Sequence, residues 1–216
     1  MNLPNSITMS RIVMIPLLLW FLSPHFPWRD PDGVQEILAS VLFILASITD
    51  GLDGYLARKR GQVTTVGMLL DPIADKIMVA GALIALVAYN PEVVKVWIAV
   101  VIIGREFLVS GLRSIASSEG FTIQASDLGK LKTVLQIITV VSAILAHHWA
   151  QWQFGMLVFP VKWIAVAAIY FTVLVSIISA VDYFVGFWKQ IDRASVDRRK
   201  TSVLSRRKSA GTPGAP

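Results

Sequence analysis

Apolar residues fill long stretches of this chain, and short polar or charged segments separate them. A helix that crosses the hydrocarbon core of a bilayer needs about 20 mostly apolar residues. Six stretches approach this length, and they cover residues 3–22, 34–50, 66–89, 93–115, 131–149 and 163–181. The pattern therefore predicts an all-α, polytopic membrane protein with six transmembrane helices.

The first stretch has a second interpretation, a secretory signal peptide that is removed from the mature chain. No basic leader precedes the stretch, and no small-residue cleavage site ends it. Three prolines, Pro24, Pro27 and Pro31, follow it instead. We therefore expect this stretch to be a retained membrane helix.

The composition agrees with a membrane protein. Hydrophobic residues make up 55% of the chain and charged residues only 16%, whereas soluble domains are about 45–50% apolar and about 25% charged. The chain has no cysteine. This excludes a disulfide scaffold, a thiolate metal site and a cysteine nucleophile.

Positive charges gather on one side of the predicted topology. Cytoplasmic loops of membrane proteins carry an excess of Lys and Arg. If the amino terminus is cytoplasmic, its side receives Arg11, Arg58, Lys59, Arg60, Arg113, Lys130, Lys132 and the basic segment from Lys189 onward. The opposite side receives Arg29, Lys95 and Lys162, diluted by four acids. We therefore predict that both termini are cytoplasmic.

The net charge of +6 owes much to the last residues of the chain. We divide the chain into a membrane domain, residues 1–188, and a basic tail, residues 189–216, which we expect to be disordered and attracted to anionic lipid. Nucleic-acid binding is the other use of such a run, but no folded domain remains to present it. We therefore predict no nucleic-acid partner.

Four aspartates lie in or beside the second and third apolar stretches. Asp50 and Asp53 are three residues apart, and Asp71 and Asp75 are four apart. Each pair therefore shares one face of its helix. Because the connection between the two stretches is short, we expect antiparallel helices whose acidic ends meet. Ionised groups at membrane depth cost several kcal/mol unless they are paired, hydrated or functional.

Four carboxylates that converge cannot all stay ionised without cations. Hard divalent ions with oxygen ligands, Mg²⁺ or Mn²⁺, suit them, since no His or Cys lies nearby to favour zinc. Two such ions about 4 Å apart serve many phosphoryl and phosphodiester displacements. The alternative is that these acids only mark helix ends or pair with Arg58 and Lys76. The adjacent glycines, Gly51, Gly54 and Gly67, permit either close helix packing or a nucleotide against bare backbone.

The same residues form a longer pattern, DxxDGxxAR followed by GxxxDxxxD, over residues 50–75. The pattern resembles the signature of the CDP-alcohol phosphatidyltransferase family, and all eight fixed positions carry the expected residue. Four further segments resemble the branch of that family that uses glycerol 3-phosphate as acceptor: residues 3–11, 104–107, 110–113 and 129–133. The resemblance covers residues 3–187.

This resemblance implies a six-helix enzyme of the cell (inner) membrane, with its active site facing the cytoplasm. Its substrate would be CDP-diacylglycerol, and its products a phosphatidyl alcohol phosphate and CMP. Two divalent ions would be held by Asp50, Asp53, Asp71 and Asp75, and Asp75 would also take the proton of the attacking hydroxyl. The residues expected to bind CDP-diacylglycerol are Thr8, Gly54, Ala57, Arg58 and Gly67. A homodimer is usual for the family.

A phosphate-bearing acceptor needs cations beyond those that hold the nucleotide. The candidates on the cytoplasmic side are Arg105, Arg113, Lys130 and Lys132. Taking the motif match into account, we favour Arg113 and Lys130 as ligands of the acceptor phosphate. We expect Arg105 and Glu106 to order the pocket instead. The alternative for Lys130 and Lys132 is that they only anchor the topology.

Other functions stay open at this point. The same chemistry could use inositol phosphate, serine or phosphatidylglycerol as acceptor. An ion-coupled transporter also has intramembrane acids, but those usually lie near the midplane on broken or repeated helices. No repeat is visible here. A non-catalytic membrane scaffold would tolerate loss of the aspartates.

Overall fold

We analysed a computed structural model of the chain, which describes residues 13–23, 26–27, 32–60, 65–120, 127–154 and 157–210. Within these ranges, side chains are not described for residues 50–60, 65–72, 75, 127–130, 154, 157 and 192–210. After a helical segment at residues 13–21, the elements are α2 (Val34–Arg60), α3 (Thr65–Tyr89), α4 (Val96–Ser118), α5 (Asp127–His148), β1 (Trp152–Phe154), β2 (Leu157–Phe159) and α6 (Val161–Ala210).

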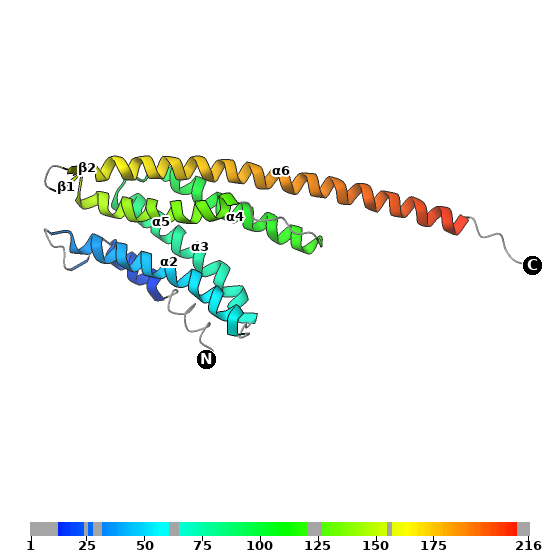
Figure 1. Ribbon diagram of the computed structural model, residues 1–216, viewed down its shortest axis with the longest axis horizontal. Helices are drawn as coiled ribbons and strands as arrows, with labels where there is room; N and C mark the ends of the chain where they lie inside the picture. Colours follow the sequence, from blue (N-terminus) through cyan, green and yellow to red (C-terminus); the bar gives the residue numbers. More distant parts are fainter. Residues whose placement is uncertain are drawn as a thin grey trace, which may run out of the picture.

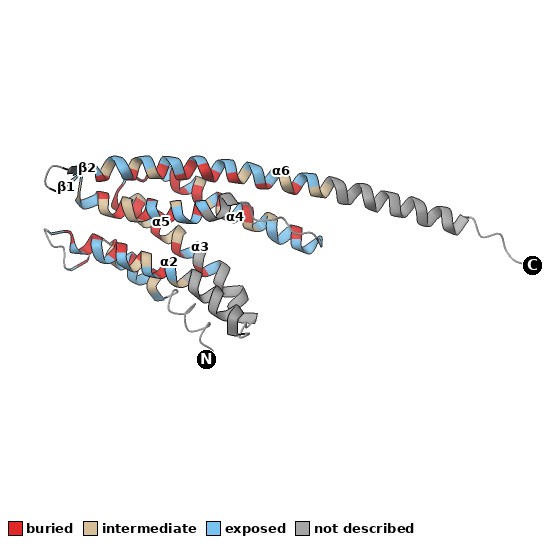
Figure 2. Ribbon diagram, viewed as in Figure 1, coloured by how far each residue is buried: buried red, intermediate tan, exposed pale blue. Residues whose placement is uncertain are grey.

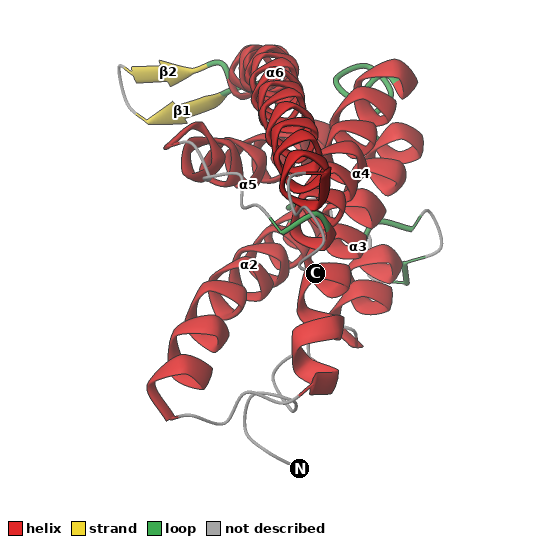
Figure 3. Cartoon of the chain, turned by 90° about the vertical axis from the view of Figure 1, so that its right-hand side faces the viewer, coloured by secondary structure: helices red, strands yellow, loops and turns green. Residues whose placement is uncertain are grey.

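The helices follow the predicted apolar stretches, and successive helices run in opposite directions (Figure 1). The chief contacts of α6 are with α5 and α4. On the other side of the bundle, α2 packs against α5, and α3 packs against α4. The contact between α2 and α3 is small. The most extensive packing in the bundle is therefore that of α6 against α5 and α4, and in the end-on view α6 lies between these two helices (Figure 3).

One element departs from the all-α prediction. The strands β1 and β2 pair antiparallel in a short hairpin between α5 and α6, with Trp152 opposite Phe159 and Gln153 opposite Val158. Aromatic and β-branched residues favour strands, and the hairpin is too short to change the apolar pattern from which the helices were predicted. The prediction was therefore right about the helices and missed the hairpin.

The bundle has an apolar core and an apolar exterior. Large side chains from every long helix are fully buried, among them Phe43, Leu83, Ile98, Ile144 and Ile169. The outer helix faces carry equally large apolar side chains that are about half exposed, such as Leu45, Ile84, Trp97, Phe171 and Leu174. Buried and exposed residues alternate along the helices (Figure 2). Helices that are apolar on both faces suit a lipid environment rather than water.

Two helical stretches of the described chain, Leu131–His148 and Val161–Ile191, are long and apolar enough to cross a membrane. Shorter apolar stretches cover Val34–Thr49 and Lys76–Tyr89. In the sequence, Asp50 directly follows the first of these stretches and Asp75 directly precedes the second.

Polar contacts join the opposite end of the bundle, where α2 begins and α3 and α5 end. The Tyr89 hydroxyl donates to Glu36 Oε1 at 2.8 Å, and Asn90 Nδ2 donates to the Ala143 carbonyl at 3.0 Å. Gly33, just before α2, has φ +73°, and a Cβ there would come within 2.5 Å of the Trp149 ring. A glycine is therefore required where the chain enters α2.

A second contact at this end lies on the surface. Lys162, at the start of α6, donates to Glu92 in the connection between α3 and α4. The hydrogen bond from Lys162, and then its charge, lowers the pKa of the Glu92 carboxyl. Because both side chains are exposed, the pair adds little to stability.

The last helix is longer than expected. In the structure α6 continues without a break to Ala210, whereas the sequence predicted disorder from residue 189. Residues 187–210 contain neither glycine nor proline and many Lys, Arg and Ala residues, which are good helix formers. Gly211 is the first helix-breaking residue after this run.

We expect Tyr89→Phe to destabilise the bundle. The change removes the hydroxyl that donates to Glu36, a residue only 5% exposed. Loss of a donor to a buried carboxylate should lower the free energy of unfolding by ~1–3 kcal/mol, measured by denaturant or thermal unfolding in detergent. Tyr170→Phe, at an exposed tyrosine of α6, is the control. Equal stability of the two variants would contradict the role given to this hydrogen bond.

Candidate active site

The predicted acids lie on neighbouring ends of two antiparallel helices. Asp50 and Asp53 belong to the last turns of α2, and Asp71 and Asp75 to the first half of α3. Their helical placement is confirmed, so the predicted i, i+3 and i, i+4 spacing holds. Their side chains lie outside the described residues. The convergence of the four carboxylates therefore stays a prediction.

The residues expected to bind CDP-diacylglycerol lie beside these acids in the chain. Gly54, Ala57 and Arg58 are in the last turns of α2, and Gly67 is in the first turn of α3. Their side chains are likewise outside the described part, and Thr8 lies outside it altogether. The assignment of all five to this substrate stays a prediction.

Three described charged side chains gather where α4, α5 and α6 meet. One carboxylate oxygen, Glu106 Oε1, accepts from Arg105 NH1 at 3.4 Å, from Gln136 Nε2 at 3.3 Å, and from Lys132 Nζ. Arg105, Lys132 and Gln136 are each less than a tenth exposed. We call Arg105, Glu106, Lys132 and Gln136 the Glu106 cluster. Its two cations and one acid are held together inside the bundle.

Helix geometry explains how the cluster forms. Lys132 and Gln136 are four residues apart on α5 and therefore share a face. Arg105 is next to Glu106 on α4 and extends towards α6, where its NH2 group donates to Ser179 Oγ. A salt bridge at this depth is stable only when further hydrogen bonds satisfy its partners. The cluster thus ties the three central helices together.

Two buried polar atoms beside the cluster have no protein partner within the part of the chain that is described. They are Arg105 Nε and Ser176 Oγ. Ser176 lies three residues before Ser179 on α6, on nearly the same face. Buried polar atoms of this kind commonly bind an ordered water. The interior between α4 and α6 is therefore polar rather than purely apolar.

Arg113 lies about two helical turns beyond Arg105 on α4 and has a different environment. It is exposed, while the aromatic partner that holds it, Tyr183 of α6, is only 5% exposed. Arg113 NH2 donates to the Tyr183 hydroxyl at 2.8 Å, and the guanidinium carbon lies 5.7 Å from the centre of the ring. The structure therefore separates Arg113 from the buried Glu106 cluster.

Of the four cations predicted for the acceptor phosphate, the structure brings two together, separates a third from them, and does not describe the side chain of the fourth. Arg105 and Lys132 share the Glu106 carboxylate. Arg113 is separate from them, and the side chain of Lys130, in the first turn of α5, is outside the described residues. Sequence reasoning missed Ser179 and Tyr183. A signal existed, because Thr172, Ser176, Ser179 and Tyr183 recur at helical spacing along apolar α6.

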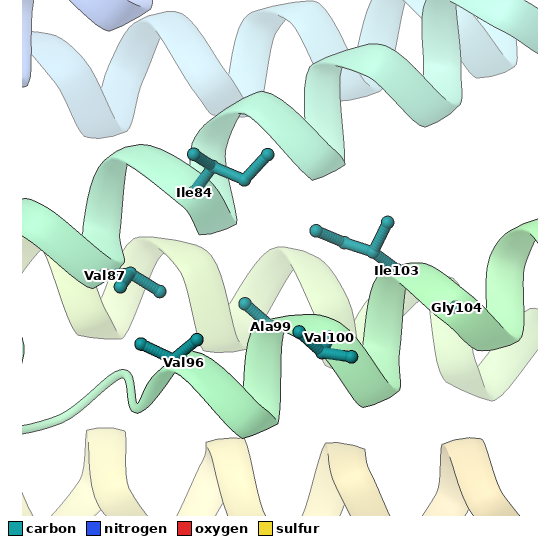
Figure 4. Close-up of a pocket in the computed structure, with 7 residues that line it drawn as sticks. All are labelled: Ile84, Val87, Val96, Ala99, Val100, Ile103 and Gly104. Carbon is teal, nitrogen blue, oxygen red and sulfur yellow. The ribbon is translucent and has the colours of Figure 1, made fainter.

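A cavity of about 420 Å³ between α3 and α4 is lined by apolar residues and backbone (Figure 4). The residues around it are Ile84, Val87, Val96, Ala99, Val100, Ile103 and Gly104. It offers no charged or nucleophilic side chain. We therefore place the chemistry at the polar ends of the helices and not in this cavity.

The family model for CDP-alcohol phosphatidyltransferases matches residues 1–185, a range that includes the four aspartates, the Glu106 cluster and Arg113. The chain belongs to the CDP-alcohol phosphatidyltransferase family. The resemblance drawn from the motif is thus confirmed over most of the chain. Together with its apolar helices, family membership makes this phosphatidyltransferase a membrane protein.

Three curated relatives of this chain carry the same name. The chain is 40% identical over 197 residues to the CDP-diacylglycerol–glycerol-3-phosphate 3-phosphatidyltransferase of Bacillus subtilis, covering 88% of this chain and 97% of the relative. It is 40% identical to the Rickettsia bellii protein of that name, and the alignment covers 67% of this chain and 75% of the relative. It is 28% identical to the Wigglesworthia glossinidia protein of that name, and the alignment covers 89% of this chain and 98% of the relative.

A solved structure has a similar fold. The phosphatidylinositol phosphate synthase of Mycobacterium tuberculosis, in complex with manganese and citrate, aligns with a TM-score of 0.62 and 18% identity. The alignment covers 87% of this chain and 83% of that one. At this identity the similarity establishes the fold of the phosphatidyltransferase and not its acceptor.

The contacts of the Glu106 cluster predict that removing its acid destabilises this phosphatidyltransferase. Glu106→Gln keeps the shape of the side chain but removes the negative charge that Arg105 and Lys132 share. We expect the free energy of unfolding to fall by ~3–5 kcal/mol, the usual cost of breaking a buried ion pair by removing one partner. Denaturant unfolding in detergent measures it, with Glu119→Gln, at an exposed acid after α4, as control.

A second variant tests the cause. Lys132→Met added to Glu106→Gln removes one of the two buried cations and should restore part of the lost stability. If Glu106→Gln unfolded like the wild type, the cluster would not be a stabilising feature of the bundle.

Proposed function

We propose that the chain transfers the phosphatidyl group of CDP-diacylglycerol to glycerol 3-phosphate, giving phosphatidylglycerophosphate and CMP. The observation that carries this proposal is the shared name of the curated relatives, of which the Bacillus subtilis protein matches along 97% of its length. The complete motif over residues 50–75 supports the same chemistry. An exposed arginine on α4 is available for a phosphate-bearing acceptor.

The helix directions support one position for the active site. The end of α2, the start of α3, the end of α4 and the start of α5 all lie at the same end of an antiparallel bundle (Figure 1). The four aspartates, Arg113 and Lys130 belong to those segments. Positive charge is biased towards this end of the bundle, so we place this end at the cytoplasmic side of the cell (inner) membrane. The chain then has six spans, and both termini are in the cytoplasm.

The donor set fits hard divalent cations. Four carboxylates at helical spacing on adjoining helix ends supply oxygen ligands of the kind that Mg²⁺ and Mn²⁺ prefer. Among the described side chains no other group of three or more His, Asp or Glu residues gathers. Asp50, Asp53, Asp71 and Asp75 would hold two ions, which neutralise and polarise the diphosphate when bound. The manganese in the Mycobacterium tuberculosis structure supports divalent metal use.

The residues of the chain then have separate roles. The hydroxyl oxygen of glycerol 3-phosphate attacks the lipid-side phosphorus, and Asp75 accepts the hydroxyl proton. The bond from that phosphorus to the bridging oxygen of the diphosphate breaks, and CMP leaves with this oxygen. Arg58 offers a planar set of donors to the departing nucleotide phosphate. Thr8, Gly54, Ala57 and Gly67 complete the CDP-diacylglycerol site.

The contacts of the described cations bear on which residues bind the acceptor phosphate. Arg105 and Lys132 already share Glu106, so we assign them to ordering the pocket. Arg113 has no acid among its contacts in the described residues, and we assign it, with Lys130, to the phosphate. The contacts of Arg105, Lys132 and Arg113 support this division of roles, which the sequence already favoured.

The proposal is tested with purified protein, CDP-diacylglycerol and a panel of acceptors, following CMP release. We expect release with glycerol 3-phosphate well above that with inositol phosphate, serine or phosphatidylglycerol. A chelator should abolish it, and Mg²⁺ or Mn²⁺ should restore it better than Zn²⁺. A preference for another acceptor would correct the substrate, and ion-coupled uptake into vesicles without CMP release would make the chain a transporter.

Asp75→Asn separates proton transfer from binding. The amide keeps the shape of the side chain but removes the proton acceptor and one negative charge. We expect kcat to fall by ~100-fold or more, with CDP-diacylglycerol binding retained at least in part. Asp182→Asn, at an exposed acid on α6, is the matched control and should leave kcat unchanged. A near-normal kcat for Asp75→Asn would remove this residue from the mechanism.

A further inference from the structure

Tyr183 is a buried tyrosine in the membrane domain whose hydroxyl is committed to one arginine. Its side chain is 5% exposed, and its hydroxyl accepts from Arg113 NH2 at 2.8 Å. The same guanidinium lies 5.7 Å from the centre of its ring. Tyr183 therefore contacts Arg113 through both its polar and its aromatic groups.

This contact restrains a side chain that would otherwise be mobile. An exposed arginine has several rotatable bonds, and fixing them upon binding costs affinity. Arg113 makes its one hydrogen bond within the described residues to Tyr183. That bond uses one of the five N–H donors of the guanidinium. The remaining donors have no partner among the described residues, and the side chain is exposed. A guanidinium can bind a phosphate through two such donors.

The partner on α6 is neutral, which distinguishes Arg113 from the cations of the Glu106 cluster. A carboxylate would neutralise the arginine, as Glu106 does for Arg105. A tyrosine hydroxyl orients the guanidinium while leaving its charge available. The arrangement therefore fits an arginine that is held in place for an anionic ligand.

We infer that Tyr183 is a positioning residue, which orients Arg113 towards the phosphate of the acceptor. The inference rests on the proposed function and adds to it a residue of α6 outside the aspartate motif. Tyr183 does not touch the substrate in this account. Its effect should therefore appear only through Arg113 and only on the acceptor.

The experiment compares four purified proteins in the CMP-release assay: Tyr183→Phe, Arg113→Ala, the double variant and the wild type. Tyr183→Phe keeps the ring and its packing and removes only the hydroxyl. Tyr170→Phe is the matched control, because Tyr170 is an exposed tyrosine of the same helix. Michaelis constants for glycerol 3-phosphate and for CDP-diacylglycerol are measured separately, with unfolding followed in detergent.

We expect Arg113→Ala to raise the KM for glycerol 3-phosphate ~10- to 100-fold, the scale of a charge-assisted contact. Tyr183→Phe should raise the same constant ~3- to 10-fold, the scale of one neutral hydrogen bond. The KM for CDP-diacylglycerol should stay unchanged in both. In the Arg113→Ala background, Tyr183→Phe should have no further effect, because the group it orients is gone.

Three results would overturn the inference while leaving the proposed function intact. They are an unchanged acceptor KM in Tyr183→Phe, equal changes for both substrates, and fully additive effects in the double variant. Tyr170→Phe should have the same Michaelis constants as the wild type. An increase in the acceptor KM equal to that of Tyr183→Phe would also contradict the role given to Tyr183. Absence of CMP release from the wild type with glycerol 3-phosphate would instead contradict the proposed function itself.

Discussion

In an apolar helix bundle, each buried ionised group needs a partner. This requirement determines how the helices of this structure pack. Glu106 meets that need for Arg105 and Lys132 at once, through one carboxylate oxygen shared with Gln136. Desolvation of three charges is costly, and their mutual attraction repays it only when hydrogen bonds complete the set. The cluster therefore fixes how α4, α5 and α6 meet, and these central helices support the ends at which the site is proposed.

The same requirement separates structural charges from functional ones. Arg105 and Lys132 both contact Glu106 inside the protein, and in the proposed function they order the pocket rather than bind substrate. Arg113 is held by a neutral tyrosine and keeps its charge for an anion. The four aspartates of α2 and α3 share their motif with Arg58, Lys59 and Arg60, and Lys76 follows it directly. In the proposed function, divalent ions would supply the positive charge that clustered carboxylates and a diphosphate substrate need.

Helix positions and the metal motif were predictable, because both depend on neighbours in the sequence. Apolar length located the helices, and spacing placed each aspartate pair on one helix face. The contact between Arg113 and Tyr183 joins residues 70 positions apart. It depends on how α4 and α6 pack, which no local pattern contains. The hairpin and the length of α6 were not predicted, because they depend on strand and helix propensity, which the apolar runs do not contain.

The central claim is that the four aspartates form a site for divalent ions. Equilibrium binding of Mn²⁺ to the purified protein in detergent, followed by electron paramagnetic resonance, tests it most directly. The account predicts two bound ions per chain close enough to be magnetically coupled. It also predicts that binding is lost when all four aspartates are replaced by asparagine. Equal Mn²⁺ binding by the wild type and the fourfold variant would contradict it.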